Sequence, residues 1–204
     1  MDRYDHLMFT DAVKALQEAD GSADMYARSY GARTHALSAD EVAFVASRTS
    51  FYMATVSETG WPYIQHRGGP AGFLKVLDDH TLGLADYRGN KQHISEGNLA
   101  GDNRVSLFLM DYPRKARMKL QGRARFQSAA DAPDLTAQLA VDGQGRVDRV
   151  VTIALEAFDW NCPQFITPRF DASEIAQLVG PEIDKQSARI AELEAELAAL
   201  KGQA

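Results

Sequence analysis

The chain has 204 residues, a length that suits one globular domain with short additions. Its formal net charge of −6 argues against a general nucleic-acid-binding protein, because such proteins need a positive field to displace counterions from phosphates. The sequence has no run of about eighteen apolar residues that would predict a membrane-spanning helix, and its N-terminus has no continuous apolar segment typical of a secretory signal. We therefore expect a soluble, cytoplasmic protein.

Cysteine and histidine usage excludes several kinds of site. The single cysteine, Cys162, rules out an intramolecular disulfide and an all-cysteine metal centre. No Ser/His/Asp or Cys/His spacing supports a covalent nucleophile at this cysteine. The histidines have no H-x-x-x-H or HExxH spacing, so we expect no metal site.

Residues 1–48 are predicted to form a helical extension. Thr10 can cap a short amphipathic helix that ends at Gly21. Ser38 and Glu41 have the spacing of a capping box in front of an apolar run.

Residues 49–170 consist of β-type runs separated by turn signals. The first run, 51–56, is followed by a return strand at 61–67, and the last run covers 147–158. Short helices are expected at 90–99 and 131–140. About six strands, mostly joined by hairpin turns, predict a mainly β fold, either a closed antiparallel barrel or a sandwich.

Residues 171–204 form a tail of a different kind. From Pro181 onward the apolar residues follow an a/d spacing, which predicts a helix of about five turns with a narrow apolar seam. These residues are Ile183, Ile190, Leu193, Leu197 and Leu200. The seam either adds to a dimer contact or packs on the barrel of its own chain.

Basic residues gather at two places in the β section. The segment 114–125 holds six basic residues and no acidic one. This favours a small anionic ligand, and the alternative is a solvated strand edge guarded by Lys and Arg. Asn90-Lys91 follows a strand and is expected to open a helix, whose free N–H groups would suit a phosphate. The alternative is an ordinary helix cap formed by Asn90.

Two further segments have ligand-binding character. Gln65-His66-Arg67 ends a strand and leads into a glycine-rich turn, where Gly68 and Gly69 permit close approach of a ligand. The alternative is a β-bulge at a barrel corner. The segment 160–164, WNCPQ, follows the last strand and combines a rigid proline with a stacking face and side-chain amides.

Over residues 43–170 these motifs resemble the flavin-nucleotide-binding branch of the pyridoxamine 5′-phosphate oxidase-like family. The resemblance implies a six-stranded antiparallel split β-barrel with peripheral helices. It also implies a homodimer with FMN at the subunit interface. The expected activity is that of an oxidoreductase acting on an unknown small molecule, with NAD(P)H as the candidate electron donor.

The resemblance also assigns cofactor-binding roles. Lys91 matches the basic residue that contacts the FMN phosphate. Arg117, with Lys119 on the same strand face, matches a side chain on the phosphate or the flavin pyrimidine. The segment after the last strand would cover the flavin from the partner subunit. The expected cofactor-binding residues are Gln65, His66, Arg67, Gly68, Gly69, Lys75, Asn90, Lys91, Arg117, Lys119, Trp160, Asn161 and Gln164.

Some features depart from the family pattern or leave alternatives open. Pro168-Arg169-Phe170 lacks the histidine of the family's C-terminal Arg-x-His element, so oxidation of pyridoxamine phosphate is not expected. Related barrels bind haem or a deazaflavin instead, and His66 or His93 would then be the candidate axial ligand. A third possibility is a non-catalytic flavin-binding or sensing protein whose C-terminal helix recruits a partner.

Overall fold

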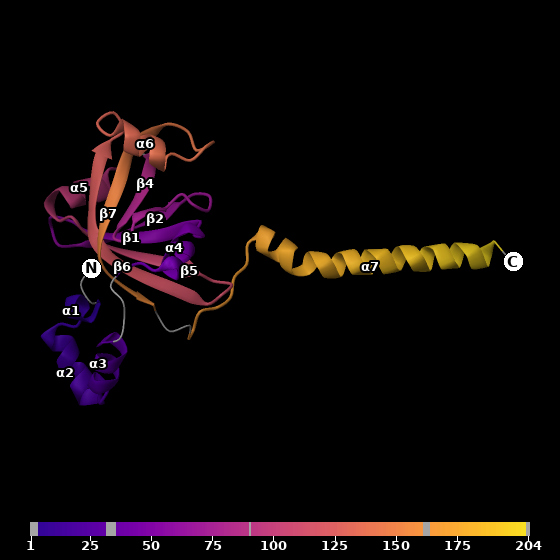
Figure 1. Cartoon of the computed structure of the whole chain (residues 1–204), viewed down its shortest axis with the longest axis horizontal. Helices are drawn as coiled ribbons and strands as arrows, with labels where there is room; N and C mark the ends of the chain where they lie inside the picture. The colour runs from indigo at the N-terminus through magenta and orange to yellow at the C-terminus, as the bar shows by residue number, and fades with distance from the viewer. Residues whose placement is uncertain (1–3, 32–35, 90, 161–163, 203–204) are drawn as a thin grey trace. The chain divides into compact units, whose positions relative to one another are not determined.

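The computed structural model describes residues 4–31, 36–89, 91–160 and 164–202. They fall into two units, one made of residues 1–111 and 116–164 and the other of residues 112–115 and 165–204. Figure 1 shows the first unit as a curled sheet with helices around it, and the second as the long helix α7 with the segment that leads into it.

The N-terminal section is helical, as predicted. It contains α1 (Tyr4–Met8), α2 (Asp11–Asp20), α3 (Ala23–Gly31) and α4 (Ala39–Ala46). Thr10 caps α2 by accepting a hydrogen bond from the backbone N–H of Val13 at 3.4 Å. The capping box of α4 is confirmed, since the Glu41 carboxylate accepts a hydrogen bond from the backbone N–H of Ser38 at 2.9 Å.

The first unit is built on a seven-stranded sheet in which every neighbouring pair is antiparallel, in the order β2-β1-β5-β6-β7-β4-β3. The strands are β1 (Ser50–Val56), β2 (Pro62–Gly68), β3 (Lys75–Asp78), β4 (Thr81–Tyr87), β5 (Arg104–Asp111), β6 (Ala116–Ser128) and β7 (Val147–Trp160). The predicted antiparallel β fold with peripheral helices is confirmed, but the number of strands differs. About six were expected, and the described residues form seven. The shortest, β3, has four residues, lies at the edge of the sheet and pairs with β4.

Alternate residues of these strands point inward and form one core. Fully buried positions include Phe51 and Met53 of β1, Leu107 and Leu109 of β5, and Met118 and Leu120 of β6. In β1, β5 and β6 the period of two places the remaining residues on the outer face. In β4, by contrast, the five consecutive residues 82–86 are all buried.

The long strands β6 and β7 bend at one position. Their register shifts between Gln121 and Gly122. A Cβ atom at Gly122 would lie 2.5 Å from the carbonyl oxygen of Ala154, so the close approach of the two backbones requires glycine there.

Two helices begin at positions other than those predicted. The helix expected from Asn90 is α5 (Ile94–Gly101), and the prediction that Lys91 opens it was wrong. Lys91 and His93 have φ angles of 59° and 55°, a left-handed conformation that an α-helix excludes. The tail helix α7 (Ala172–Lys201) begins nine residues before Pro181, behind a capping box at Asp171, and contains that proline in its interior.

Candidate functional site

A cavity of about 420 Å³ opens between β2, β4, β7 and the start of α5. This volume lies in the range of small-molecule sites in proteins. Its charged lining comprises the cations Arg67, Lys91 and Arg149 and the carboxylates Asp86, Glu96 and Asp148.

Strand periodicity decides which β2 residues face this cavity. Tyr63, Gln65 and Arg67 are half-buried and line it, whereas the alternating Ile64 and His66 are exposed. Gln65 is held in place by the Ser95 hydroxyl of α5, which donates a hydrogen bond to its Oε1 at 2.7 Å.

Asp86 is the centre of a buried charge network. It lies opposite Arg149 in the β4–β7 pairing, and its Oδ2 accepts hydrogen bonds from Arg149 Nε at 2.9 Å and Nη2 at 2.6 Å. Its Oδ1 accepts a hydrogen bond from Arg67 Nη1. Both guanidinium groups also lie near the Phe126 ring. The distance from Cζ to the ring centroid is 5.9 Å for Arg67 and 5.2 Å for Arg149. One buried carboxylate therefore holds two guanidinium groups side by side at the cavity wall.

Glu96, in the first turn of α5, is the second carboxylate on Arg149. It accepts a hydrogen bond from Arg149 Nη1 and lies 2.6 Å from His93 Nδ1. Its side chain is 38% exposed, whereas that of Asp86 is 7% exposed. The Glu96 contact is therefore open to solvent and to competing anions, and the Asp86 contact is sheltered.

Within the part of the chain that the structure describes, the cavity presents a buried donor without an acceptor and an exposed cation without an ion pair. The Arg67 Nε atom is buried and has no hydrogen-bond partner among the described residues. Lys91 is exposed and forms no ion pair with the part of the chain that the structure describes. His93 occupies the N-cap position of α5, but its side chain accepts no hydrogen bond from the first backbone N–H groups of this helix. A buried donor without an acceptor costs about 1–3 kcal/mol, and an anion with several acceptor oxygens would remove that cost.

A smaller hollow of about 220 Å³ adjoins the cavity and shares Gln65, Arg67 and Asp86 with it. Its lining includes the predicted His66, Gly68 and Gly69, together with the apolar Phe73, Leu84 and Val141. At Gly69 the glycine is required by packing within the chain, since an added Cβ atom would lie 2.7 Å from Phe73 Cβ.

Lys75 lies elsewhere. Its Nζ donates hydrogen bonds to the carbonyl oxygens of Gln138 at 2.6 Å and Ala140 at 3.4 Å, at the C-terminal end of α6 (Pro133–Leu139). A cation at this position satisfies the carbonyl groups and the dipole of the helix end. The structure thus supplies a structural role for Lys75.

Arg117 and Lys119 lie near the start of β6, away from Phe126 at its far end, and line neither cavity. Lys119 is 3.5 Å from the Asp159 carboxylate, and Arg117 Nε is buried without a hydrogen-bond partner among the described residues. Gln164 is exposed in a turn. Asn90 and Asn161 lie outside the described residues. It stays a prediction that the cofactor held by a partner subunit is contacted by Arg117, Lys119, Gln164, Asn90 and Asn161.

Trp160 is bound to α4 rather than to a cavity. Its Nε1 donates a hydrogen bond to Glu41 Oε1 at 2.7 Å, and its ring meets Phe44 edge-on at 4.6 Å. Burial alone would raise the pKa of Glu41, but the hydrogen bonds from Ser38 and Trp160 outweigh burial and lower it. The hydrogen bond from Trp160 thus links the capping box of α4 to the end of β7.

Sequence reasoning missed Asp86 and Arg149. Asp86 does carry a signal, because it ends the apolar strand run 81–85, and a carboxylate buried in such a strand requires a cationic partner. The partner, 63 residues further on, is identified only by the pairing of β4 with β7.

Two other kinds of feature are absent from the described residues. The described residues contain no cluster of three or more His, Cys, Asp or Glu side chains that could hold a metal ion. Among the helices that the structure describes, none combines the length and apolar character needed to cross a membrane.

A family model described as pyridoxamine 5′-phosphate oxidase matches residues 37–153, which is more than half of the chain. The chain belongs to this family. This match confirms the resemblance seen in the sequence motifs at the level of the family. No curated protein matches the chain significantly.

The chain is also similar to several solved structures of other proteins. HupZ from Group A Streptococcus is 18% identical, with 66% of this chain and 99% of that chain covered and a TM-score of 0.48. A protein related to general stress protein 26, of the pyridoxinephosphate oxidase family, from Clostridium acetobutylicum is 16% identical, with 60% and 85% covered and a TM-score of 0.44. A FAD-binding protein from Mesorhizobium loti is 14% identical, with 61% and 94% covered and a TM-score of 0.40.

Proposed function

We propose that the protein binds FMN through its phosphate in the cavity beside Asp86 and works as an FMN-dependent oxidoreductase on a small molecule, with NAD(P)H as the electron donor. The observation that carries this proposal is the convergence of Arg67, Lys91 and Arg149 on one cavity, together with the buried Arg67 Nε, which has no acceptor among the residues that the structure describes. Membership in the pyridoxamine 5′-phosphate oxidase family supports it.

The charges of the lining indicate how a phosphate would be held. A phosphate monoester carries close to two negative charges at pH 7, whereas the three cations of the lining are matched by three carboxylates. Asp86 is buried and stays in place, where it orients Arg67 and Arg149. Glu96 is more exposed and can turn into water, which frees Arg149 Nη1 for a phosphate oxygen. The phosphate thus takes the place of the Glu96 carboxylate.

The remaining residues would serve the rest of the cofactor. A bound flavin supplies hydride or electron transfer, which requires no protein nucleophile. Gln65 offers an amide to a polar edge of the ligand, and the neighbouring hollow offers the apolar surfaces of Phe73, Leu84 and Val141. These groups would orient the cofactor and exclude water from it.

We also propose that the protein forms a homodimer and that the two copies meet through the outer face of β1 and β2. Tyr52, Val56 and Ile64 are 41%, 39% and 65% exposed there, and Tyr52 pairs with His66 across the two strands. An exposed apolar sheet face of this kind is typical of an interaction surface.

The first test is the visible absorption spectrum of the purified protein, with the mass of the released chromophore. FMN is the expected chromophore. A Soret band, or preferential uptake of hemin or a deazaflavin over FMN, would contradict the proposal. Turnover with NAD(P)H separates an oxidoreductase from a non-catalytic flavin-binding protein.

A second test concerns the phosphate itself. Lys91→Ala is expected to weaken FMN binding about tenfold and to leave binding of riboflavin, which has no phosphate, unchanged. Arg88→Ala is the matched control, because Arg88 is an exposed cation nearby that does not line the cavity. An equal loss of FMN and riboflavin in Lys91→Ala, or no loss, would show that the phosphate lies elsewhere.

A further inference from the structure

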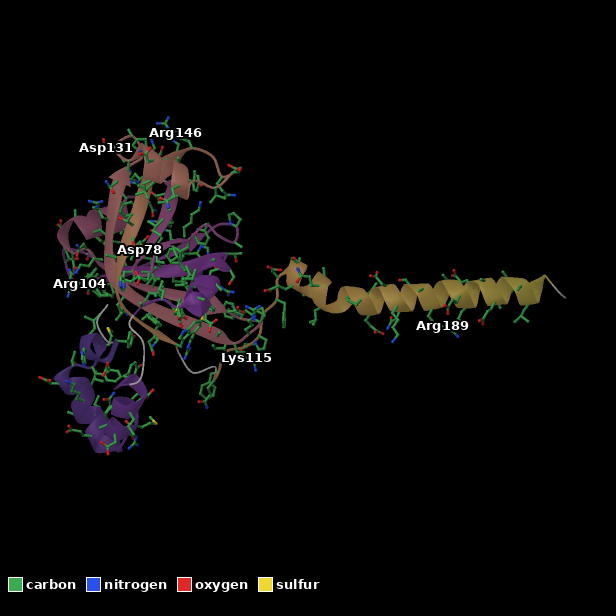
Figure 2. The ribbon with its side chains drawn as sticks, viewed as in Figure 1. Asp78, Arg104, Lys115, Asp131, Arg146 and Arg189 are labelled. Atoms are coloured by element: carbon green, nitrogen blue, oxygen red, sulfur yellow. The ribbon has the colours of Figure 1, made fainter. Side chains whose placement is uncertain are left out.

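The second half of α7 carries a regular apolar stripe on a helix in which none of the described residues is buried. From Ile190 to Leu200 the large apolar side chains follow one another at spacings of three and four residues, and Ile183 lies seven residues before Ile190. The side chains of Ile183, Ile190, Leu193, Leu197 and Leu200 are 57%, 56%, 46%, 51% and 67% exposed. Figure 2 shows the side chains of this helix, with Arg189 projecting from its surface.

The stripe has the dimensions of a helix–helix contact. In heptad notation, Ile183, Ile190 and Leu197 occupy a positions, and Gln186, Leu193 and Leu200 occupy d positions. Such a strict a/d stripe is narrower than the apolar face of a helix that packs on a sheet. In parallel coiled coils, isoleucine at a with leucine at d favours two strands over three or four.

The charges beside the stripe match a second copy of the same helix. In a parallel pair, each g position faces the e position of the next heptad in the partner. Arg189 at g then faces a glutamate at position 194, and Glu196 at g faces a lysine at position 201. Both contacts join opposite charges, and the symmetry of the pair makes each contact twice.

Gln186 decides the direction of the pair. In a parallel pair, Gln186 meets the same residue of the other copy, and the two amides can hydrogen-bond to each other. In an antiparallel pair with its ends aligned, Gln186 would face Leu197 and its amide would be buried without a partner. We propose that residues 182–201 of α7 form a parallel, in-register, two-stranded coiled coil with the same segment of a second copy of this chain.

Pro181 sets the N-terminal limit of this coiled coil. Proline has no N–H group, so the hydrogen bond to the Gln177 carbonyl is missing, and the helix bends near this point (Figure 1). Before Pro181, Val179 still occupies a d position, but the preceding a position holds only Ala176. The exposed Ile175 and Leu178 fall at g and c positions, so the regular stripe of large apolar side chains ends here.

Cysteine cross-linking of the full-length chain tests the proposal. In a Cys162→Ser background, Gln186→Cys places a thiol at a d position without removing an apolar residue. Ala195→Cys is the matched control, because position 195 is an f position on the opposite side of the helix. Under mild oxidation, Gln186→Cys is expected to form disulfide-linked dimers at least tenfold faster than Ala195→Cys. Dimerisation of the barrels would bring both thiols closer to the same extent, so the ratio reports on α7 alone.

A charge exchange gives a second readout. Adding Arg189→Glu to Gln186→Cys is expected to slow cross-linking, and adding Glu194→Arg as well is expected to restore it, since the pair is then attractive again. Equal rates for Gln186→Cys and Ala195→Cys would overturn the proposal and indicate that the stripe is covered by the chain's own barrel. With Gln186 kept, cross-linking of a Leu193→Cys chain mainly with a second chain carrying Ile190→Cys, rather than with its own kind, would overturn it in favour of an antiparallel pair.

Discussion

Replacing Asp86 with asparagine is expected to destabilise the protein by about 3 kcal/mol. The substitution keeps the size of the side chain and removes the charge that pairs with Arg67 and Arg149. Breaking a buried ion pair costs about 3–5 kcal/mol, because the remaining charges stay buried without compensation. The side chains of Arg67 and Arg149 are 15% and 22% exposed, so the lower end of this range applies. At this chain length the loss corresponds to a fall of about 6–12 °C in Tm.

Urea unfolding at pH 7, followed by circular dichroism, measures this loss, and Asp148→Asn is its matched control. Asp148 lines the same cavity, but it lies 3.6 Å from Arg146 in a pair whose side chains are 34% and 80% exposed. The control should therefore change the free energy of unfolding by less than about 0.5 kcal/mol. Inorganic phosphate should restore part of the stability of Asp86→Asn, since it can pair with the uncovered guanidinium groups. Equal stability of Asp86→Asn and the unaltered chain, or equal losses in the two variants, would refute the central role of Asp86.

Three further predictions concern stability. Gly122→Ala should lower the free energy of unfolding in urea by at least about 2 kcal/mol, because its Cβ atom would lie 2.5 Å from the Ala154 carbonyl oxygen. Gly97→Ala, at a position in α5 where an added Cβ atom meets no neighbour, should raise the free energy of unfolding by about 0.5–1 kcal/mol. Glu41→Gln should cost about 1–2 kcal/mol at pH 7. The folded-state pKa of Glu41 is lowered, so its carboxylate stabilises the fold fully above the ordinary value of 4.5, and the deficit of the variant should disappear as the pH falls through the lowered pKa. Lys75→Met should lower stability by about 1 kcal/mol and leave FMN affinity unchanged, and a clear loss of affinity would contradict the helix-capping role of this lysine.

The parts of the fold that were predictable depend on residues close together in the chain. The capping box at Ser38 and Glu41 and the hairpin of β1 and β2 are both formed by neighbouring segments, so their residue types carry enough information. The start of α5 was not predictable in this way. Asparagine at position 90 is a good helix cap in general, and the left-handed backbone at Lys91 and His93 that delays the helix is not encoded by residue type.

The fold class and the basic residues of β2 and of the segment before α5 could be predicted from residue types, because strand periodicity and the charges of Arg67 and Lys91 are properties of single segments. Which charges meet depends on the folded chain. Asp86 and Arg149 lie 63 residues apart and come together through the pairing of β4 with β7. Arg67 reaches the same carboxylate from β2, a strand that is not a neighbour of β4 in the strand order, because the sheet curls (Figure 1). A site built from side chains on separate strands depends on strand order and register, and these result from packing of the whole sheet rather than from any local pattern.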